Sequence, residues 1–127
     1  MFEHRIRVRY GECDMQGVVF NANYLVYIDD TTDTWTRSLT GGGPEGYGYD
    51  FMLKKAELTW HSPVRFGESI DIKAHVGRWG RTSFDAVITG SVDGRAAFDA
   101  TITYVIVALG TNVPTPPSDE LRTALGG

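Results

Sequence analysis

The stretch YGECDMQGVVFNANYLVYID, residues 10–29, joins a segment of alternating polar and apolar residues to the start of a long helical pattern. It places a carboxylate, Asp14, shortly before Gly17, whose conformational freedom permits a sharp turn. Asn21 or Asn23 is suited to cap the helix that follows, because an asparagine side chain accepts hydrogen bonds from free amides. The stretch therefore predicts a strand, a tight turn carrying an acid, and a helix.

The chemistry of this arrangement follows from the helix start. Amides in the first turn of a helix have no partner within the helix, and the helix dipole favours negative charge there. A carboxylate a few residues upstream is therefore suited to acyl transfer, with the amides stabilising the oxyanion. Taken alone the pattern is weak, because an aspartate in a turn is more often solvated or bonded to its own turn.

The helical pattern extends from Ala22 to Leu39, with apolar or buried-type positions three and four residues apart: Leu25, Ile28, Thr32, Trp35 and Leu39. Gly41 is placed to end this helix in a left-handed conformation. The glycine-rich stretch GGGPEGYGYD, residues 41–50, lacks the ending of a phosphate-binding loop and predicts a mobile connection. The proline-rich tail predicts at most a short terminal helix.

Period-two alternation predicts strands before and after the helix, at residues 5–10, 55–60, 70–76, 82–92 and 95–109. The dipeptide Asp93-Gly94 between the last two is typical of a two-residue hairpin. A lone long helix has to be covered by the sheet, so the chain is expected to be α+β, an antiparallel sheet curled around one helix. The last strand is apolar on both faces, which indicates that a partner or second sheet covers one of them.

Composition excludes several functions. With 127 residues, the chain is expected to form a single domain, residues 1–127. A formal net charge of −4 argues against nucleic acid as a partner, and no stretch is long enough to span a membrane. One cysteine and no Cys/His ligand spacing leave no expected metal site and no cofactor. The N-terminal residues do not form a signal peptide, so a cytoplasmic location is expected.

Residues 10–29 resemble the opening of the hotdog-fold acyl-CoA thioesterases of the 4-hydroxybenzoyl-CoA thioesterase type. The resemblance continues through WHSPVRFGESIDIKAHVGRWGRTSFDAVI, residues 60–88, and covers about residues 5–108. It implies a hotdog fold, in which an antiparallel sheet of five or six strands wraps around one long helix. It also implies a homodimer, or a dimer of dimers, with active sites between subunits.

By position in this resemblance, Asp14 is the catalytic carboxylate and the backbone amide of Asn21 is the oxyanion donor. Whether Asp14 attacks the carbonyl or activates water stays open, since both roles need the same carboxylate. In a related branch, associated with the Tol-Pal system, a histidine stands where this chain has Asn21. Four further residues are expected to contact the substrate: Gly17, Val18, Tyr24 and His61.

The segment RWGRTSF, residues 78–84, resembles the part of these thioesterases that holds the nucleotide of coenzyme A. Arg78, Arg81 and Thr82 are the expected contacts, and arginine pairs with phosphate in bidentate fashion. Gly80 and Thr82 replace residues that are often basic in the family.

The leading interpretation is a thioester hydrolase that releases a free acid and a thiol from an acyl-CoA or an acyl carrier protein. The alternative is a hotdog protein that binds acyl groups without hydrolysing them, as an accessory subunit or sensor. The sequence does not assign the acyl group.

Overall fold

The computed structural model describes residues 1–40 and 42–126. Its helices and strands follow the order expected from the sequence, one strand, a long helix and then four strands: β1 (Phe2–Arg7), α1 (Asn23–Thr40), β2 (Tyr49–Trp60), β3 (Ser69–Trp79), β4 (Ser83–Val92), β5 (Arg95–Ala108) and α2 (Asp119–Leu125). Two short 3-10 helices, η1 (Tyr10–Glu12) and η2 (Gly43–Tyr47), lie in the connections on either side of α1.

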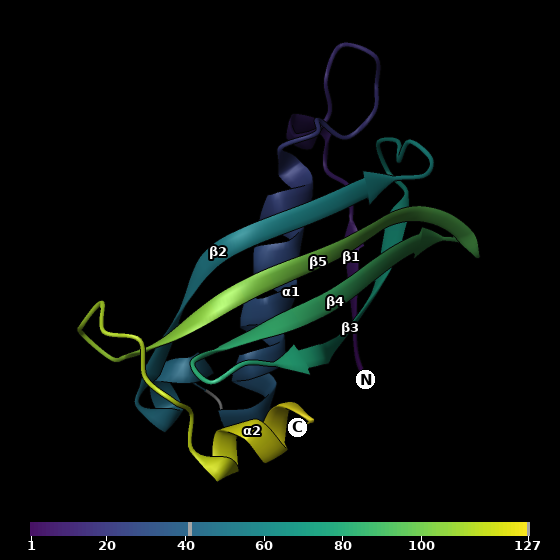
Figure 1. The fold of residues 1–127 in the computed structure, drawn as a ribbon. Coiled ribbons are helices and arrows are strands. Elements are labelled where there is room, and N and C mark those ends of the chain that lie inside the picture. The colour runs from purple at the N-terminus through teal and green to yellow at the C-terminus, as the bar shows by residue number, and fades with distance from the viewer. Residues whose placement is uncertain (41, 127) are drawn as a thin grey trace.

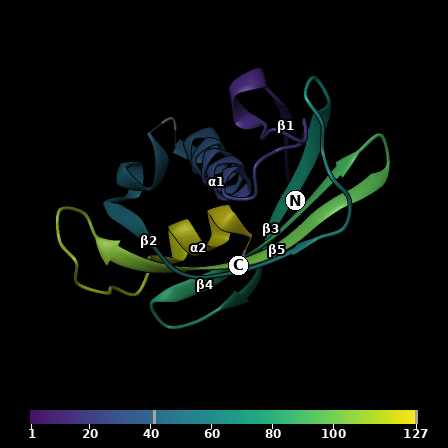
Figure 2. The same ribbon diagram turned by 90° about the horizontal axis from the view of Figure 1, so that it is seen from above.

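The five strands form one antiparallel sheet in the order β1-β3-β4-β5-β2. The sheet is curved, and α1 runs along its concave face with α2 beside it (Figures 1 and 2). This is the α+β hotdog arrangement that the sequence predicts, with five strands around one long helix. The two ends of the sheet are occupied differently (Figure 1). The loops before α1 and after β2 lie at one end of the sheet, and α2 lies at the opposite end.

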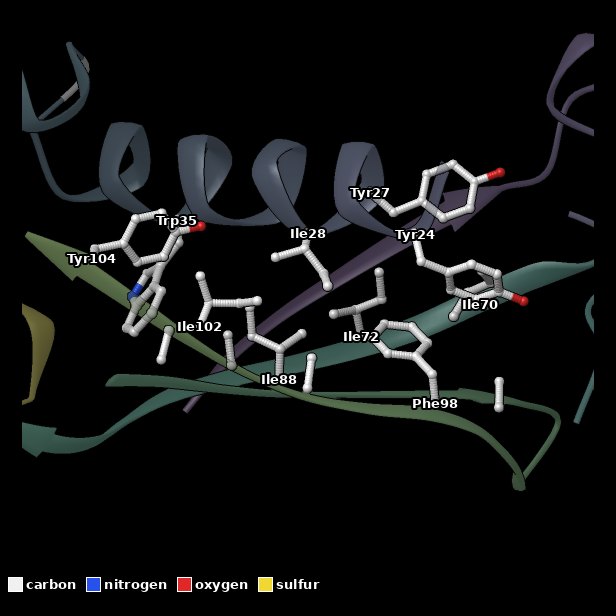
Figure 3. Close-up of a cluster of buried hydrophobic side chains, with 14 of the residues drawn as sticks. Tyr24, Tyr27, Ile28, Trp35, Ile70, Ile72, Ile88, Phe98, Ile102 and Tyr104 are labelled. Atoms are coloured by element: carbon white, nitrogen blue, oxygen red, sulfur yellow. The ribbon is translucent and has the colours of Figure 1, made fainter. Parts of the chain in front are cut away.

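Burial of one face of α1 against the sheet forms the core (Figure 3). Ile28 and Thr31 of the helix are completely buried, and Trp35 is 5% exposed. A fully buried isoleucine such as Ile28 contributes about 1.5–3 kcal/mol relative to an exposed position. The predicted stripe is correct at Ile28, Thr32 and Trp35 but wrong at Leu25, which is 38% exposed.

The buried face turns instead toward Tyr24 and Tyr27, each 2% exposed, at the start of α1. Tyr24 stacks edge-on against Phe98 of β5, with ring centroids 5.4 Å apart. Gly90 of β4 makes room for the Phe98 ring, since a Cβ at that position would lie 2.2 Å from Phe98 Cε1. A glycine in one strand thus lets an aromatic ring of the next reach the helix.

The N-terminal strand ends earlier than predicted. β1 stops at Arg7, and Tyr10, expected to face the core, is 81% exposed. Its ring packs edge-on against Phe66 of the loop after β2, with centroids 5.9 Å apart. The turn η1 therefore separates the strand from the acid-bearing loop, and Asp14 does not follow the strand directly.

In the glycine-rich connection after α1, residues 43–47 form the 3-10 helix η2, and the mobility of this connection stays a prediction. Pro44 opens η2, Gly43 and Pro44 are buried, and Gly48 ends the turn at φ 87°. β2 then begins at Tyr49, well before the expected residue 55. The predicted helix end at Gly41 lies outside the described residues.

The predicted hairpin is confirmed: Asp93 and Gly94 join β4 to β5 with φ of 49° and 82°. The short terminal helix is also confirmed as α2, capped by the side chain of Ser118. The tail before it runs beside the end of β5, where Thr115 N–H donates to Ile106 O at 2.8 Å.

At the apolar end of β5 the chain's own tail covers Val107, whereas Val105 is half-buried, and a partner on this face stays a prediction. Val107 is 3% exposed within the single chain and forms an isolated bridge with Pro114 of the tail. The sheet is open at β2, the last strand in the order, where Met52 and Leu53 are each 47% exposed. An unpaired strand of this kind is a template for pairing with another chain.

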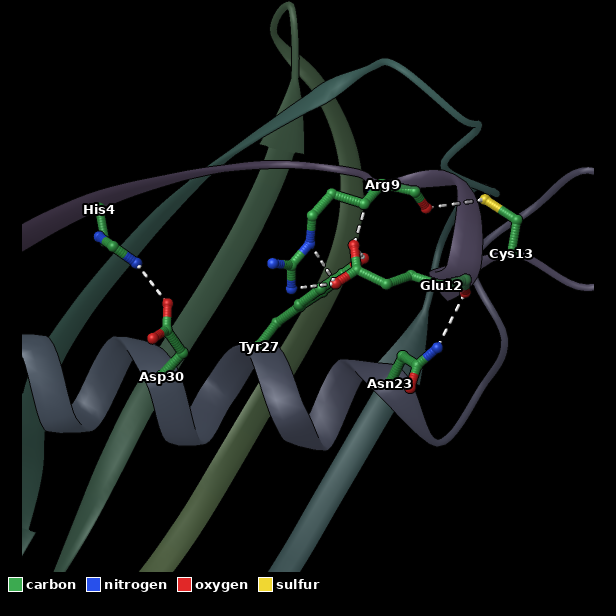
Figure 4. Close-up of polar contacts among 7 residues, drawn as sticks. All are labelled: His4, Arg9, Glu12, Cys13, Asn23, Tyr27 and Asp30. Atoms are coloured by element: carbon green, nitrogen blue, oxygen red, sulfur yellow. Dashed lines mark hydrogen bonds and ion pairs between the residues drawn. The ribbon is translucent and has the colours of Figure 1, made fainter.

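A buried acid fastens the loop before α1 to the helix (Figure 4). The Glu12 side chain is 14% exposed, and Oε1 accepts hydrogen bonds from the Tyr27 hydroxyl at 2.9 Å and the Arg9 amide at 2.8 Å. Arg9 Nε donates to Oε2 at 2.9 Å. The carbonyl of Glu12 accepts from Asn23 Nδ2 at 2.8 Å, so Asn23 bridges loop and helix.

Burial raises the pKa of Glu12, but the hydrogen bonds from Arg9 and Tyr27 together bring the pKa below its ordinary value. Burial and the neighbouring carboxylate raise the pKa of Tyr27, which keeps its hydroxyl as a donor. Glu12 is therefore held in its charged form, and its removal leaves a buried hydroxyl without its acceptor.

We expect Glu12→Gln to lower the free energy of unfolding by about 1–3 kcal/mol at neutral pH, because the amide is a weaker acceptor for Arg9 and Tyr27. Glu57→Gln is the matched control, since Glu57 is 64% exposed in β2 and pairs only with Lys55. Its effect should stay within about 0.5 kcal/mol. Urea denaturation of the two variants and the wild type measures the difference.

The pH dependence gives a second readout of the same pair. The pKa of Glu12 is lower in the folded protein than in the unfolded chain. Its contribution to the free energy of unfolding is therefore complete above the unfolded-state pKa and is lost as the pH falls through the folded-state pKa. The difference in the free energy of unfolding between the wild type and Glu12→Gln should therefore become smaller in that acidic range. A difference that is constant with pH would mean that the Glu12 charge is not responsible.

Candidate active site

Asp14 lies in a tight turn between η1 and α1. Its N–H donates to Val18 O at 2.9 Å, and its carbonyl accepts from the Gly17 amide at 3.0 Å. Gly17 adopts a φ of 77°, as its predicted role requires. Asp14 Oδ1 accepts from the Gln16 amide at 2.8 Å, whereas Oδ2 accepts no hydrogen bond from the described residues. One oxygen thus orients the carboxylate and the other is available for chemistry.

The start of α1 presents free donors. Tyr24 N–H donates to Asn21 O and Leu25 N–H to Ala22 O, in the first turn of the helix. The amides of Asn21 and Ala22 themselves donate to no acceptor in the part of the chain that the structure describes. Neither Asn21 nor Asn23 caps the helix with its side chain there, contrary to expectation. The first amides therefore stay open to an anion.

A pocket of about 250 Å³ lies between this helix start and the loop after β2. It brings together three predicted substrate contacts, Val18, Tyr24 and His61, with Asn21. The remaining lining residues are Val19, Trp60, Ser62 and Pro63. Apolar residues are combined in its walls with the polar residues Asn21, His61 and Ser62, which is the character of a small-molecule site.

Tyr24 and Trp60 shape the pocket wall. Their rings pack edge-on with centroids 6.1 Å apart, and Trp60 is 48% exposed. Burial raises the pKa of Tyr24, so its phenol stays protonated. Gly17 and Asp14 do not line the pocket; they lie in the turn that leads into Val18.

His61 is paired with a residue that is distant in sequence. Its Nε2 lies 2.8 Å from Oδ2 of Asp99 in β5, and its backbone N–H donates to Ala97 O at 2.8 Å. No local motif indicates this pairing, because the two residues are brought together by the register of β2 and β5.

Arg78, Arg81 and Thr82 lie at the other end of the sheet, at the turn between β3 and β4. Both arginines are exposed, and Gly80 N–H closes the turn on Ser83 O at 2.8 Å. β3 has 11 residues, so this turn is about 30 Å from the loop where β3 begins. One chain does not bring these residues to Asp14.

Among residues 1–40 and 42–126, no three side chains of the His, Cys, Asp and Glu types are grouped to hold a metal ion. None of the described helices is long and apolar enough to cross a membrane.

The role of Glu12 was not predicted, because the sequence pattern favours an outward-facing position for this acid. Its spacing of three residues from Arg9 is a local signal of an ion pair, but its bond to Tyr27 depends on how the loop folds back on α1. Ser62 and Val19 were also not predicted as lining residues.

Three solved structures show what the fold of this chain is similar to. A hypothetical protein from Aquifex aeolicus matches at 21% identity over 98% of this chain and 99% of its own, with a TM-score of 0.88. A 1,4-dihydroxy-2-naphthoyl-CoA thioesterase from Synechocystis matches at 17% identity over 98% and 94%, with a TM-score of 0.85. A thioesterase from Thermus thermophilus, complexed with coenzyme A and zinc, matches at 21% identity over 97% and 90%, with a TM-score of 0.84.

At these identities the structural likeness establishes the fold. No curated protein sequence matches the chain significantly. The family model of the thioesterase-like superfamily, however, matches residues 8–125, nearly the whole described chain and both walls of the pocket. The chain therefore belongs to the thioesterase-like superfamily.

Proposed function

We propose that this protein hydrolyses acyl thioesters of coenzyme A, with Asp14 as the reacting carboxylate. Two observations support this most directly: one Asp14 oxygen accepts no hydrogen bond from the described residues, and seven residues further on the amides at the start of α1 have no partner among them. The names of two matched structures, one a CoA thioesterase and one a thioesterase bound to coenzyme A, agree with that class of substrate.

The chemistry follows from these positions. The acyl group occupies the apolar pocket, and its carbonyl oxygen points to the amide of Asn21. Attack on the carbonyl carbon places negative charge on that oxygen, where the amides and the helix dipole stabilise it. Asp14 either attacks directly or removes a proton from water, and the thiolate leaves.

We also propose that two copies pair along β2 to form a homodimer. Antiparallel pairing about a two-fold axis would set the Tyr49 end of one β2 beside the Trp60 end of the other. The turn that carries Arg81 lies at the Tyr49 end of the sheet, since Ser83 is level with Val105 and Tyr49 with Ala108. The partner's Arg81 would thus approach the pocket at Trp60 and bind the phosphates of the substrate.

We expect Asp14→Asn to lower kcat by about 10²–10⁴-fold, with KM and melting temperature nearly unchanged. The loss corresponds to about 3–5 kcal/mol of transition-state stabilisation. Benzoyl-CoA, acetyl-CoA and palmitoyl-CoA are assayed by released thiol. Asp93→Asn is the matched control, because asparagine tolerates the positive φ of Asp93 in the distant β4–β5 turn.

Near-normal kcat in Asp14→Asn would exclude Asp14 from the chemistry. If the wild type releases no thiol from any of the three thioesters or from an acyl carrier protein, the protein is an acyl-binding protein rather than a hydrolase.

We expect Arg81→Ala to raise KM for the acyl-CoA about tenfold while kcat changes little, because a phosphate contact far from the carbonyl binds ground and transition states alike. With an acyl-N-acetylcysteamine thioester, which lacks the nucleotide, variant and wild type should have equal kcat/KM. A defect that persists with this short thioester would assign Arg81 a structural role.

Mixing the two impaired variants tests the shared site. In a heterodimer of Asp14→Asn and Arg81→Ala subunits, one site carries both substitutions and the other carries neither. After exchange of subunits, we expect about a quarter of the wild-type activity at low substrate concentration, well above either variant alone. If each site is complete within one chain, the mixture will show only the average activity of the two variants.

A further inference from the structure

The pocket wall includes a histidine, paired with a carboxylate outside the pocket, that the function proposed above does not use. His61 lines the pocket together with Asn21, and its Nε2 lies 2.8 Å from Asp99 Oδ2. An imidazole supported by a carboxylate is the arrangement by which hydrolases hold a histidine in one tautomer and stabilise its protonated form. Arg95, which lies near this part of the loop, is already bonded to Glu68 at 3.0 Å.

The backbone on which His61 sits is held on several sides. The amides of His61 and Ser62 both donate to Ala97 O, at 2.8 and 3.3 Å. Ser62 Oγ donates to Ala96 O at 2.7 Å, and Arg95 Nη1 donates to Pro63 O at 2.9 Å. The imidazole therefore extends from a fixed segment, as a group that must hold a constant position during a reaction requires.

The bond to Asp99 favours one of the two ring nitrogens as the reactive one. A carboxylate only accepts hydrogen bonds, so the contact with Asp99 favours the neutral tautomer that carries its proton on Nε2. In that tautomer Nδ1 has a lone pair that can take a proton from water. A volume of about 250 Å³ is enough for a small acyl group and a water molecule together.

We propose that His61, oriented by Asp99, is the general base of a two-step hydrolysis in which Asp14 is the nucleophile. This rests on the proposed thioesterase function and decides between the two roles left open for Asp14. His61 is then a catalytic residue and Asp99 a positioning residue.

In the first step an oxygen of Asp14 bonds to the acyl carbon, the carbon–sulfur bond breaks, and the thiolate leaves to be protonated by solvent. The product is a mixed anhydride between the acyl group and Asp14. In the second step His61 Nδ1 takes a proton from water as the water oxygen bonds to the acyl carbon. The bond to Asp14 breaks, which restores its carboxylate and releases the acid, and His61 returns its proton to solvent.

The test follows thiol release on the millisecond scale with the acyl-CoA of the panel that the wild type hydrolyses fastest. We expect His61→Gln to lower kcat by about 10²-fold. A rapid burst of one thiol per site should remain, because only the second step is slowed. His75→Gln is the matched control, since His75 is exposed in β3 and is not among the residues that line the pocket.

Two additions separate a catalytic role from a structural one. Hydroxylamine attacks an anhydride without a base, so it should restore turnover of His61→Gln and yield the acyl hydroxamate. Free imidazole should raise the slow rate of His61→Gly, in which the base is missing but its space remains. Asp99→Asn should show the same burst with a smaller loss of kcat, and imidazole should not rescue it.

The proposal is overturned if His61→Gln retains kcat within about threefold of the wild type, or if its burst disappears together with its steady-state rate. It is also overturned if hydroxylamine and imidazole have no effect on properly folded variants. Loss of the proposed function itself looks different, because then the wild type releases no thiol at all.

Discussion

The partly buried carboxylate of Glu12 holds the loop before α1 in place, and that loop depends on how the charge is paired. Its carboxylate joins Arg9 on one side to Tyr27 on the other, and its carbonyl accepts from both the Phe20 amide and the Asn23 side chain. Both ends of the segment between η1 and α1 are thereby fixed to the helix. The position of the Asp14 turn relative to the first amides of α1 follows from this closure, and so does the shape of the pocket on which the proposed chemistry depends.

Much of the fold can be predicted from local patterns, because those patterns record burial directly. The alternation in the four later strands and the Asp93-Gly94 turn reflect only neighbours a few residues away, and both predictions hold. The predictions for Leu25 and Tyr10 were wrong because of tertiary packing. The helix is rotated so that two of its tyrosines face the core, and the Tyr10 ring packs on Phe66 outside the core.

In the candidate site, likewise, some features can be predicted from the sequence and others cannot. Asp14 and Asn21 are seven positions apart in one short connection, so the sequence alone indicates both as candidates. His61 and Asp99 meet only through strand register, and the sequence holds no trace of that contact. The separation of Arg81 from Asp14 by the length of the sheet is equally invisible, since each residue lies in a plausible local motif.

The absent side chain at Gly90 has a consequence for the choice of acyl group. The Phe98 ring occupies the space over Gly90, Tyr24 rests on Phe98, and Trp60 rests on Tyr24 at the pocket wall. Three rings packed in series thus connect the β4 backbone at Gly90 to the cavity, although no atom of Gly90 lines it. The length or bulk of the acyl chain that this protein accepts is therefore tunable from a strand that never touches the substrate, and relatives that differ at this position are expected to differ in selectivity while keeping the same reacting groups.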